Sequence, residues 1–202
     1  MRLMFSSSKQ QRAKMKLIGF ILSISFCCVS IVFANDILRL NITGESTGTI
    51  DILLNDTVAP RHVERLRLLT LEKKYDGVAF HRVIPGFMAQ TGDVKFGNIN
   101  NFDPSLVGMG GSDYPMLKEE FSDEKFLRGT VGMARSRDPN SANSQFFIMF
   151  EPAPHLDGQY TIVGEVIAGL DVVLGIKKGT SVNNGSVKDP DFILTAEILE
   201  KD

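Results

Sequence analysis

Residues 80–93 hold the side chains whose types and spacing suggest chemistry, and they read FHRVIPGFMAQTGD. The pattern is typical of two strands joined by a tight turn, because Pro85-Gly86 combines a fixed φ with a residue that tolerates positive φ. Residues two apart on a strand share a face, so Met88 and Gln90 lie together. The hairpin can therefore bring an amide and a soft apolar group close to the guanidinium of Arg82. An ordinary hairpin with a solvated arginine is the alternative.

Two later segments carry further motifs, SANSQFFI at 141–148 and LDGQYTIVGEV at 156–166. Together with FHRVIPGFMAQTGD, they stand in an order and at a spacing that resembles the cyclophilin family of peptidyl-prolyl isomerases. The resemblance extends from about Leu38 to Glu197, and three long motifs make it specific. It is closest to the bacterial-type cyclophilins, because Tyr160 stands where eukaryotic members have histidine.

The resemblance implies a role for each of nine residues. It assigns the catalytic role to Arg82. It implies an apolar pocket for the proline ring, formed by Phe87, Met88, Phe147, Leu156 and Tyr160. Gln90 matches the amide that holds the substrate backbone, and Ala134 and Arg135 match the strand that pairs with an extended peptide. Family members usually have asparagine in place of Arg135, which leaves the role of that side chain open.

The chemistry implied is rotation about the peptide bond that precedes a proline. Amide resonance sets a barrier of ~18–20 kcal/mol. The transition state is twisted, and its proline nitrogen regains a lone pair. A donor aimed at that lone pair stabilises the twisted form more than the planar one. The guanidinium of Arg82 suits this role because it stays charged and carries several N–H groups.

The three histidines are scattered along the sequence and do not predict a metal site. His62 is expected on the polar side of a helix, and His81 opposite Arg82 along its strand. His155 occupies the position of the tryptophan that contacts cyclosporin in sensitive cyclophilins, at the rim of the implied pocket or as a solvated bystander. We therefore expect weak cyclosporin binding with isomerase activity retained. We expect no cofactor.

Charge and cysteine content exclude several classes of function. Residues 1–34 contain five Lys and Arg and no Asp or Glu, so the rest of the chain is net acidic. An acidic domain argues against nucleic-acid binding, which needs a basic face. Cys27 and Cys28 both lie in this leader. Residues 35–202 can therefore form no disulfide, cysteine nucleophile or zinc–thiolate site.

The leader has the pattern of an export signal. Its basic start is followed by an apolar run over 17–34, and Val32-Phe33-Ala34 places small residues where a signal peptidase reads. We expect residues 1–34 to be a signal peptide and residues 35–202 to be the isomerase domain, periplasmic or secreted. The run is also long enough to span a membrane, so an uncleaved anchor facing the periplasm is the alternative. Translation can start at Met1 or at Met15.

The elements that must position the site are mostly strands. Alternation of apolar residues predicts strands over 37–43, 49–55, 130–134, 145–150, 160–167 and 192–199, besides the two of the hairpin. Helical spacing predicts a helix from Pro60, with Arg65 on its solvent side, and a short helix over 170–178. Residues 93–128 are irregular and are expected to form loops beside the groove. The fold class is mainly β, and the resemblance implies a closed eight-stranded antiparallel barrel capped by two α-helices.

Two other functions compete with isomerisation. A hydrolase would use Ser141 or Ser144 with His155, but no G-x-S-x-G elbow is present. A chaperone that binds prolyl peptides with weak turnover would keep the pocket, and only a rate measurement separates it from an enzyme. For an isomerase and for such a chaperone alike, the expected partners are proline-containing polypeptides, and we expect a monomer.

Overall fold

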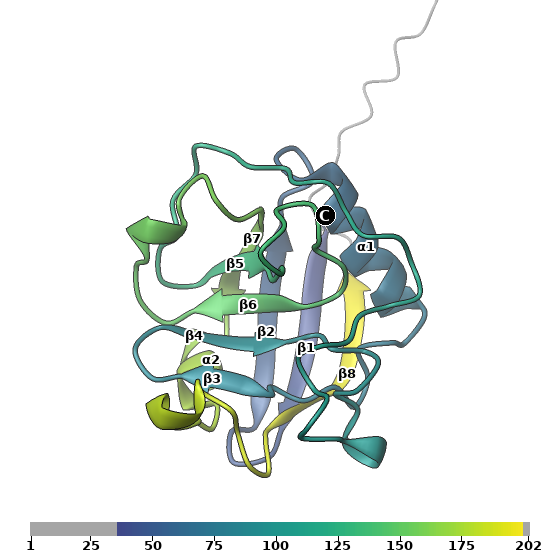
Figure 1. The fold of residues 1–202 in the computed structure, drawn as a ribbon, viewed down its shortest axis with the longest axis vertical. Coiled ribbons are helices and arrows are strands. Elements are labelled where there is room, and N and C mark those ends of the chain that lie inside the picture. The colour runs from purple at the N-terminus through teal and green to yellow at the C-terminus, as the bar shows by residue number, and fades with distance from the viewer. Residues whose placement is uncertain (1–35, 200–202) are drawn as a thin grey trace, which may run out of the picture. The chain divides into compact units, whose positions relative to one another are not determined.

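The computed structural model describes residues 36–199, whose strands form one curled antiparallel sheet (Figure 1). The strands are β1 (Ile37–Thr43), β2 (Gly48–Leu54), β3 (Arg82–Ile84), β4 (Met88–Thr91), β5 (Thr130–Met133), β6 (Phe146–Met149), β7 (Ile162–Ala168) and β8 (Phe192–Leu199). Their order in the sheet is β3-β4-β6-β5-β7-β2-β1-β8. The helices are α1 (Pro60–Leu71) and α2 (Leu170–Gly175), and three short 3₁₀ turns are η1 (Ile99–Asn101), η2 (Pro154–Leu156) and η3 (Ser181–Asn183). The predicted eight strands and two helices are confirmed.

The expected closed barrel is not confirmed. Strands β3 and β8 are the two ends of the sheet, and within residues 36–199 no strand ladder joins them. Two isolated bridges connect this side, one between Ala79 and Phe192 and one between Arg82 and Ser186, together with single backbone hydrogen bonds such as that from the N–H of Phe80 to the carbonyl of Asp191 at 2.8 Å. Strand β3 has three residues, and all three pair with β4. Sequence periodicity predicts where strands lie, but it does not predict which two strands would have to pair to close a barrel.

Residues 179–187 cover the outer edge of β3. The N–H of Val83 donates to the carbonyl of Gly185 at 2.7 Å, and the N–H of Gly179 donates to the carbonyl of Val83 at 2.9 Å. A Cβ on Gly185 would lie 2.5 Å from Cγ1 of Ile84, so only glycine allows this approach. The exposed edge that a short end strand would leave is thus occupied by the chain itself.

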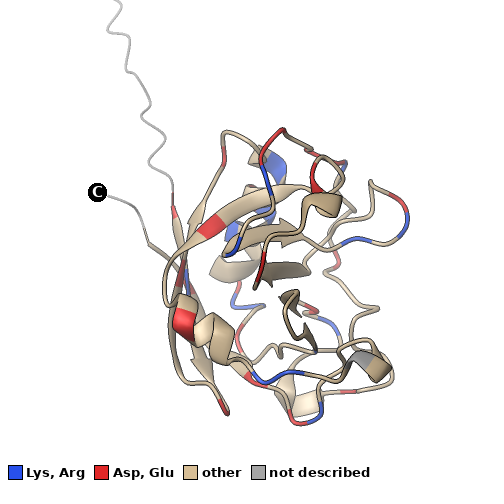
Figure 2. Ribbon diagram, turned by 90° about the vertical axis from the view of Figure 1, so that its left-hand side faces the viewer, with Lys and Arg blue, Asp and Glu red and all other residues tan. Residues whose placement is uncertain are grey.

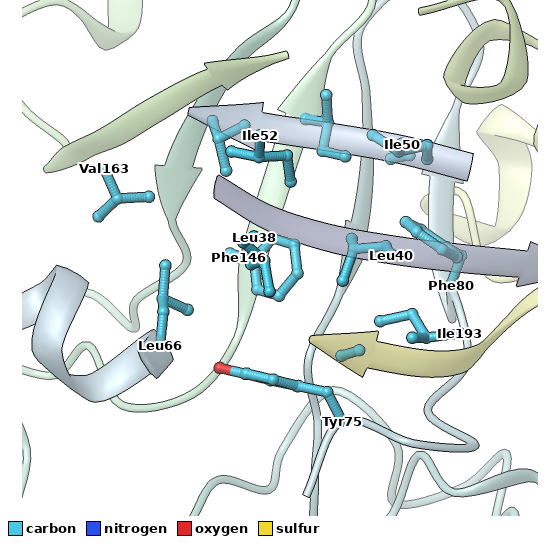
Figure 3. Close-up of a cluster of buried hydrophobic side chains, with 14 of the residues drawn as sticks. Leu38, Leu40, Ile50, Ile52, Leu66, Tyr75, Phe80, Phe146, Val163 and Ile193 are labelled. Atoms are coloured by element: carbon cyan, nitrogen blue, oxygen red, sulfur yellow. The ribbon is translucent and has the colours of Figure 1, made fainter. Parts of the chain in front are cut away.

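The main core lies between the sheet and α1, and the alternation of the first two strands explains it (Figure 3). Leu38 and Leu40 of β1 and Ile50 and Ile52 of β2 are fully buried, because alternate residues of a strand share a face. Side chains from other elements complete this cluster, among them Leu66, Tyr75, Phe80, Phe146, Val163 and Ile193. Burying each such side chain contributes about 1.5–3 kcal/mol, so this cluster is the base that holds the site in place.

Helix α1 differs from its prediction on one face. Arg65 is only 8% exposed and His62 is fully buried, although both were expected to face water. The irregular segment 112–120 covers this side of the helix. Glu120 accepts from Nδ1 of His62 at 2.6 Å, and Arg65 donates to the carbonyl of Pro115 at 2.9 Å. Helical spacing identifies the face toward the sheet, but it does not show that a distant loop covers the opposite face.

The irregular segment after β4 is organised by one buried carboxylate. Asp93 is fully buried and accepts from the backbone N–H groups of Gly108 at 2.7 Å and Gly110 at 3.0 Å. It also accepts from the N–H groups of Lys95 and Phe96. The two ends of the loop are therefore tied together, and residues 108–110 lie beside the site, as predicted for this segment.

The sequence also led to expectations about the charge of the domain, metal binding and the leader. Figure 2 shows acidic and basic residues interspersed along the elements. No helix within residues 36–199 has the length and apolar character needed to cross a membrane. In the same range no three His, Cys, Asp or Glu side chains are grouped as metal ligands. The leader, residues 1–34, lies outside the described residues.

Candidate active site

The hairpin at the centre of the site forms as its sequence predicts. Arg82 on β3 lies directly opposite Gln90 on β4. Gly86 in the connecting turn has φ +69°, which glycine adopts without strain. The turn is closed by the N–H of Phe87, which donates to the carbonyl of Ile84 at 3.1 Å. Because the two residues are a cross-strand pair, Nη1 of Arg82 donates to Oε1 of Gln90 at 3.0 Å.

The guanidinium of Arg82 is held in place rather than left in solvent. Besides Gln90, it binds Asn184 twice, from Nε to the main-chain carbonyl and from Nη2 to Oδ1, each at 3.0 Å. Nη1 also lies 4.0 Å from Sδ of Met88. Burial lowers the pKa of Arg82, and Tyr160 opposes that shift. Among residues 36–199 no carboxylate forms an ion pair with Arg82, so its positive charge has no countercharge.

A chain of amides connects Arg82 to the neighbouring loop. Nε2 of Gln90 donates to Oε1 of Gln145 at 2.9 Å. Nε2 of Gln145 then donates to the carbonyls of Gly108 and Gly110 at 3.1 and 2.7 Å. Each amide uses its oxygen toward Arg82 and its nitrogen away from it. The orientation of Gln90 is thereby fixed, and so is the acceptor that it presents to the guanidinium.

The apolar part of the site is a second hydrophobic cluster, separate from the main core. The rings of Phe126 and Phe147 stack with centroids 5.8 Å apart, and Tyr160 meets Phe147 edge to face at 5.8 Å. A Cβ on Gly132 would lie 2.6 Å from Cζ of Phe147, so this glycine makes room for the ring. Rigid aromatic walls of this kind suit the burial of a small apolar ring.

The structure brings all nine implied residues around one cavity of about 170 Å³. Its lining consists of Arg82, Phe87, Met88, Gln90, Ala134, Arg135, Phe147, Leu156 and Tyr160. One side is polar and carries the guanidinium and the amide, and the other is apolar. These residues come from β3, β4, the turn between them, β6 and η2, and from the segments that follow β5 and η2, which explains why only the folded chain assembles them.

Two of the nine have main-chain or side-chain contacts that limit their roles. The N–H of Ala134 donates to the carbonyl of Gln145 at 2.9 Å, so this donor is already used within the protein. The guanidinium carbon of Arg135 lies 4.2 Å above the ring of Tyr160. Its Nη2 also donates to the carbonyl of Gln159 at 2.9 Å. The side chain of Arg135 therefore supports the aromatic wall.

Two further features border this cavity. A larger cavity of about 460 Å³ adjoins it and shares Gln90, Ala134 and Arg135 with it. His155 is not among the nine lining residues; it stacks on Phe87 with ring centroids 5.7 Å apart. It is exposed and packs against a residue that forms one wall of the smaller cavity.

Three residues of the site were not singled out from the sequence. Gln145 belongs to the motif SANSQFFI, so its position was available, but its hydrogen bond with Gln90 was not predicted. Asn184 precedes Gly185 in a turn-type dipeptide, and its φ of +52° fits that turn. Phe126 lies in the irregular segment, where no periodicity marks a buried ring.

Comparison with known proteins identifies the family. The family described as cyclophilin type peptidyl-prolyl cis-trans isomerase/CLD matches residues 38–198. The chain belongs to this family. The resemblance indicated by the three motifs is confirmed, and the protein is a cyclophilin-type peptidyl-prolyl cis–trans isomerase.

Individual cyclophilins extend the comparison. The chain is 60% identical over 152 residues to a probable peptidyl-prolyl cis-trans isomerase of Brucella suis biovar 1 (strain 1330), covering 75% of this chain and 78% of that protein. A Cryptosporidium parvum cyclophilin, solved in the presence of the dipeptide Ala-Pro, has a TM-score of 0.67 and 25% identity. That match covers 82% of this chain and 99% of the other. A cyclophilin from Hirschia baltica has a TM-score of 0.64 and 25% identity, covering 80% of this chain and 73% of the other.

Proposed function

We propose that Arg82 accelerates prolyl isomerisation by donating to the proline nitrogen as the amide twists. The observation that carries this proposal is an uncompensated guanidinium on the polar side of a cavity whose other side is apolar. A donor that is already oriented costs no reorganisation when the transition state forms. Such a donor contributes roughly 3–4 kcal/mol. Holding one end of the peptide while the other turns contributes the remainder.

The substrate is a proline-containing polypeptide, with its pyrrolidine ring in the smaller cavity. The ring contacts Phe147, Leu156 and Tyr160 and is retained by burial of apolar surface. A peptide with proline in this position extends past Gln90 into the larger cavity, where the residue before proline has room. Because the N–H of Ala134 is engaged, the main chain of Arg135 supplies the backbone pairing. The Ala-Pro dipeptide named with the Cryptosporidium parvum cyclophilin agrees with this class of ligand.

A turnover assay on a short peptide with one X-Pro bond tests the role of Arg82. Arg82→Ala should lower kcat/KM by about 10²–10³, the range seen when one preorganised donor is removed. Arg39→Ala is the matched control, because Arg39 also belongs to a cross-strand pair but lies outside the cavity; its rate should equal that of the wild type. Equal rates for Arg82→Ala and the wild type would instead favour a prolyl-peptide-binding chaperone.

We also propose that the enzyme acts on exported proteins. The support is the leader pattern, a basic start followed by an apolar run that ends in Val32-Phe33-Ala34. N-terminal sequencing of the exported protein should find Asn35 first. An intact leader would identify a membrane anchor in place of a signal peptide.

Cyclosporin should bind weakly, because His155 stands where sensitive relatives have tryptophan. His155 stacks on Phe87 and does not line the cavity. Titration of the wild type with cyclosporin checks this expectation, and a sub-micromolar affinity would contradict it. We propose a monomer, which a measurement of molar mass in solution tests.

A further inference from the structure

Asn184 makes two of the three short hydrogen bonds that hold the guanidinium of Arg82. Its main-chain carbonyl accepts from Nε and its Oδ1 accepts from Nη2, each at 3.0 Å. The third bond runs from Nη1 to Gln90. A guanidinium has five N–H groups, so these three bonds leave one on each terminal nitrogen, and the one on Nη1 faces Sδ of Met88 at 4.0 Å. Asn184 and Gln90 thus fix the plane of the fork from two sides and leave donors for a substrate.

The loop that carries Asn184 is anchored to the strand that carries Arg82. The N–H of Val83, the next residue after Arg82, donates to the carbonyl of Gly185 at 2.7 Å. The N–H of Gly185 closes the turn on the carbonyl of Thr180 at 2.9 Å. Asn184 itself has φ +52°, a conformation that asparagine tolerates better than most residues. The position of its side chain relative to Arg82 is therefore set by the backbone on both sides.

We propose that Asn184 is a positioning residue for the isomerase, which holds the guanidinium of Arg82 in the orientation that meets the twisting proline nitrogen. This inference rests on the proposed role of Arg82. Asn184 supplies neutral acceptors, so it orients the fork without cancelling its charge. A long arginine side chain that loses such partners spreads over several rotamers, and only part of the population then presents a donor to the substrate.

Asn184→Gly tests the inference, because glycine removes the side chain and adopts positive φ without strain. We expect kcat/KM to fall roughly five- to tenfold, the effect of losing one ordinary hydrogen bond. Peptide affinity, measured separately by titration, should stay at the wild-type value. Asn183→Ala is the matched control: the side chain of this neighbouring asparagine accepts no hydrogen bond from Arg82, and this variant should turn over like the wild type.

A double-mutant cycle with Arg82→Ala separates positioning from a general effect on the fold. If Asn184 acts through Arg82, the double variant should be as slow as Arg82→Ala alone. An Asn184→Gly rate equal to the wild type, or an equal further loss in the Arg82→Ala background, would overturn the inference while leaving the role of Arg82 intact. A wild-type rate for Arg82→Ala would overturn the proposed function itself.

Discussion

Arg39 and Arg82 occupy equivalent places in two different hairpins, yet their partners differ. Arg39 on β1 lies directly opposite Asp51 on β2, and Arg82 on β3 lies directly opposite Gln90 on β4. Arg39 binds both carboxylate oxygens of Asp51 at 2.8 Å, whereas Arg82 binds one amide oxygen at 3.0 Å. Their hydrogen bond raises the pKa of Arg39 and lowers the pKa of Asp51. Burial lowers the pKa of Arg82.

The same cross-strand geometry can therefore either neutralise an arginine or only orient it. A carboxylate opposite an arginine gives a neutral pair, which suits the outer face of a sheet. An amide orients the guanidinium equally well but leaves its charge available to a ligand. In a partly dry cavity an uncompensated charge acts more strongly than in water. The identity of the partner, rather than that of the arginine, therefore distinguishes the proposed catalytic position from the structural one.

Placing a carboxylate beside Arg82 should give it a neutral ion pair like that of Arg39 with Asp51. Asn184→Asp keeps an acceptor oxygen at the same place, and aspartate tolerates positive φ. The new charge should bind the guanidinium and offset its field at the proline nitrogen, so kcat/KM should fall about tenfold, which is roughly 1.4 kcal/mol of activation free energy. The protease-coupled assay on an X-Pro peptide measures it.

The melting temperature provides the control for Asn184→Asp. An added ion pair should leave stability unchanged or slightly higher, so lost activity cannot be assigned to unfolding. A variant with wild-type turnover would show that the charge of Arg82 is not what the reaction uses, and that only the direction of its N–H groups matters.

The sequence predicts well those features that depend on local periodicity or on a continuous motif. Leu38, Leu40, Ile50 and Ile52 alternate, and their burial follows from the geometry of a strand. The turn at Gly86 follows from its dipeptide. The cavity residues were found through the family motifs, since Phe87, Met88, Phe147, Leu156 and Tyr160 alone could be read as core residues and Arg82 as a solvated one.

What the sequence could not predict depends on contacts between irregular segments. Asn184 lies 102 positions after Arg82, and nothing periodic connects the two. His62 and Arg65 were expected in water because a helical pattern cannot show that segment 112–120 covers them. The barrel closure failed for a related reason, since β3 is short and residues 179–187 take the place of a neighbouring strand.

The second prediction concerns pH and uses the residue next to Arg82. His81 is 4% exposed, and neither ring nitrogen has a hydrogen-bond partner among the described residues. Burial lowers its pKa, Arg82 lowers it further, and Asp93 raises it. Below pH 6.5, the ordinary pKa of histidine, His81 binds a proton in the unfolded chain but not in the native one. Its contribution to the free energy of unfolding is therefore complete above pH 6.5 and is lost as the pH falls.

Chemical denaturation between pH 7.5 and 5.5 checks this dependence. His81→Phe removes the titrating group at similar volume and should reduce the slope by up to about 1.4 kcal/mol per pH unit. His62 is also buried with a lowered pKa, so part of the slope should remain. A wild-type slope for His81→Phe would mean that His81 is protonated equally in both states.

The smallest expected effect is the reverse exchange in the structural pair. Asp51→Asn gives Arg39 an amide partner like that of Arg82, and it should leave turnover unchanged because the pair lies outside the cavity. It should cost less stability than lowering the pH from 7.5 to 5.5 does, since a half-buried ion pair near the surface contributes little. Turnover and denaturation measured on the same preparation test both parts. If Asp51→Asn slowed the enzyme as much as Asn184→Asp, charge around the arginines would act through the whole sheet, and the contrast between the two hairpins would lose its meaning.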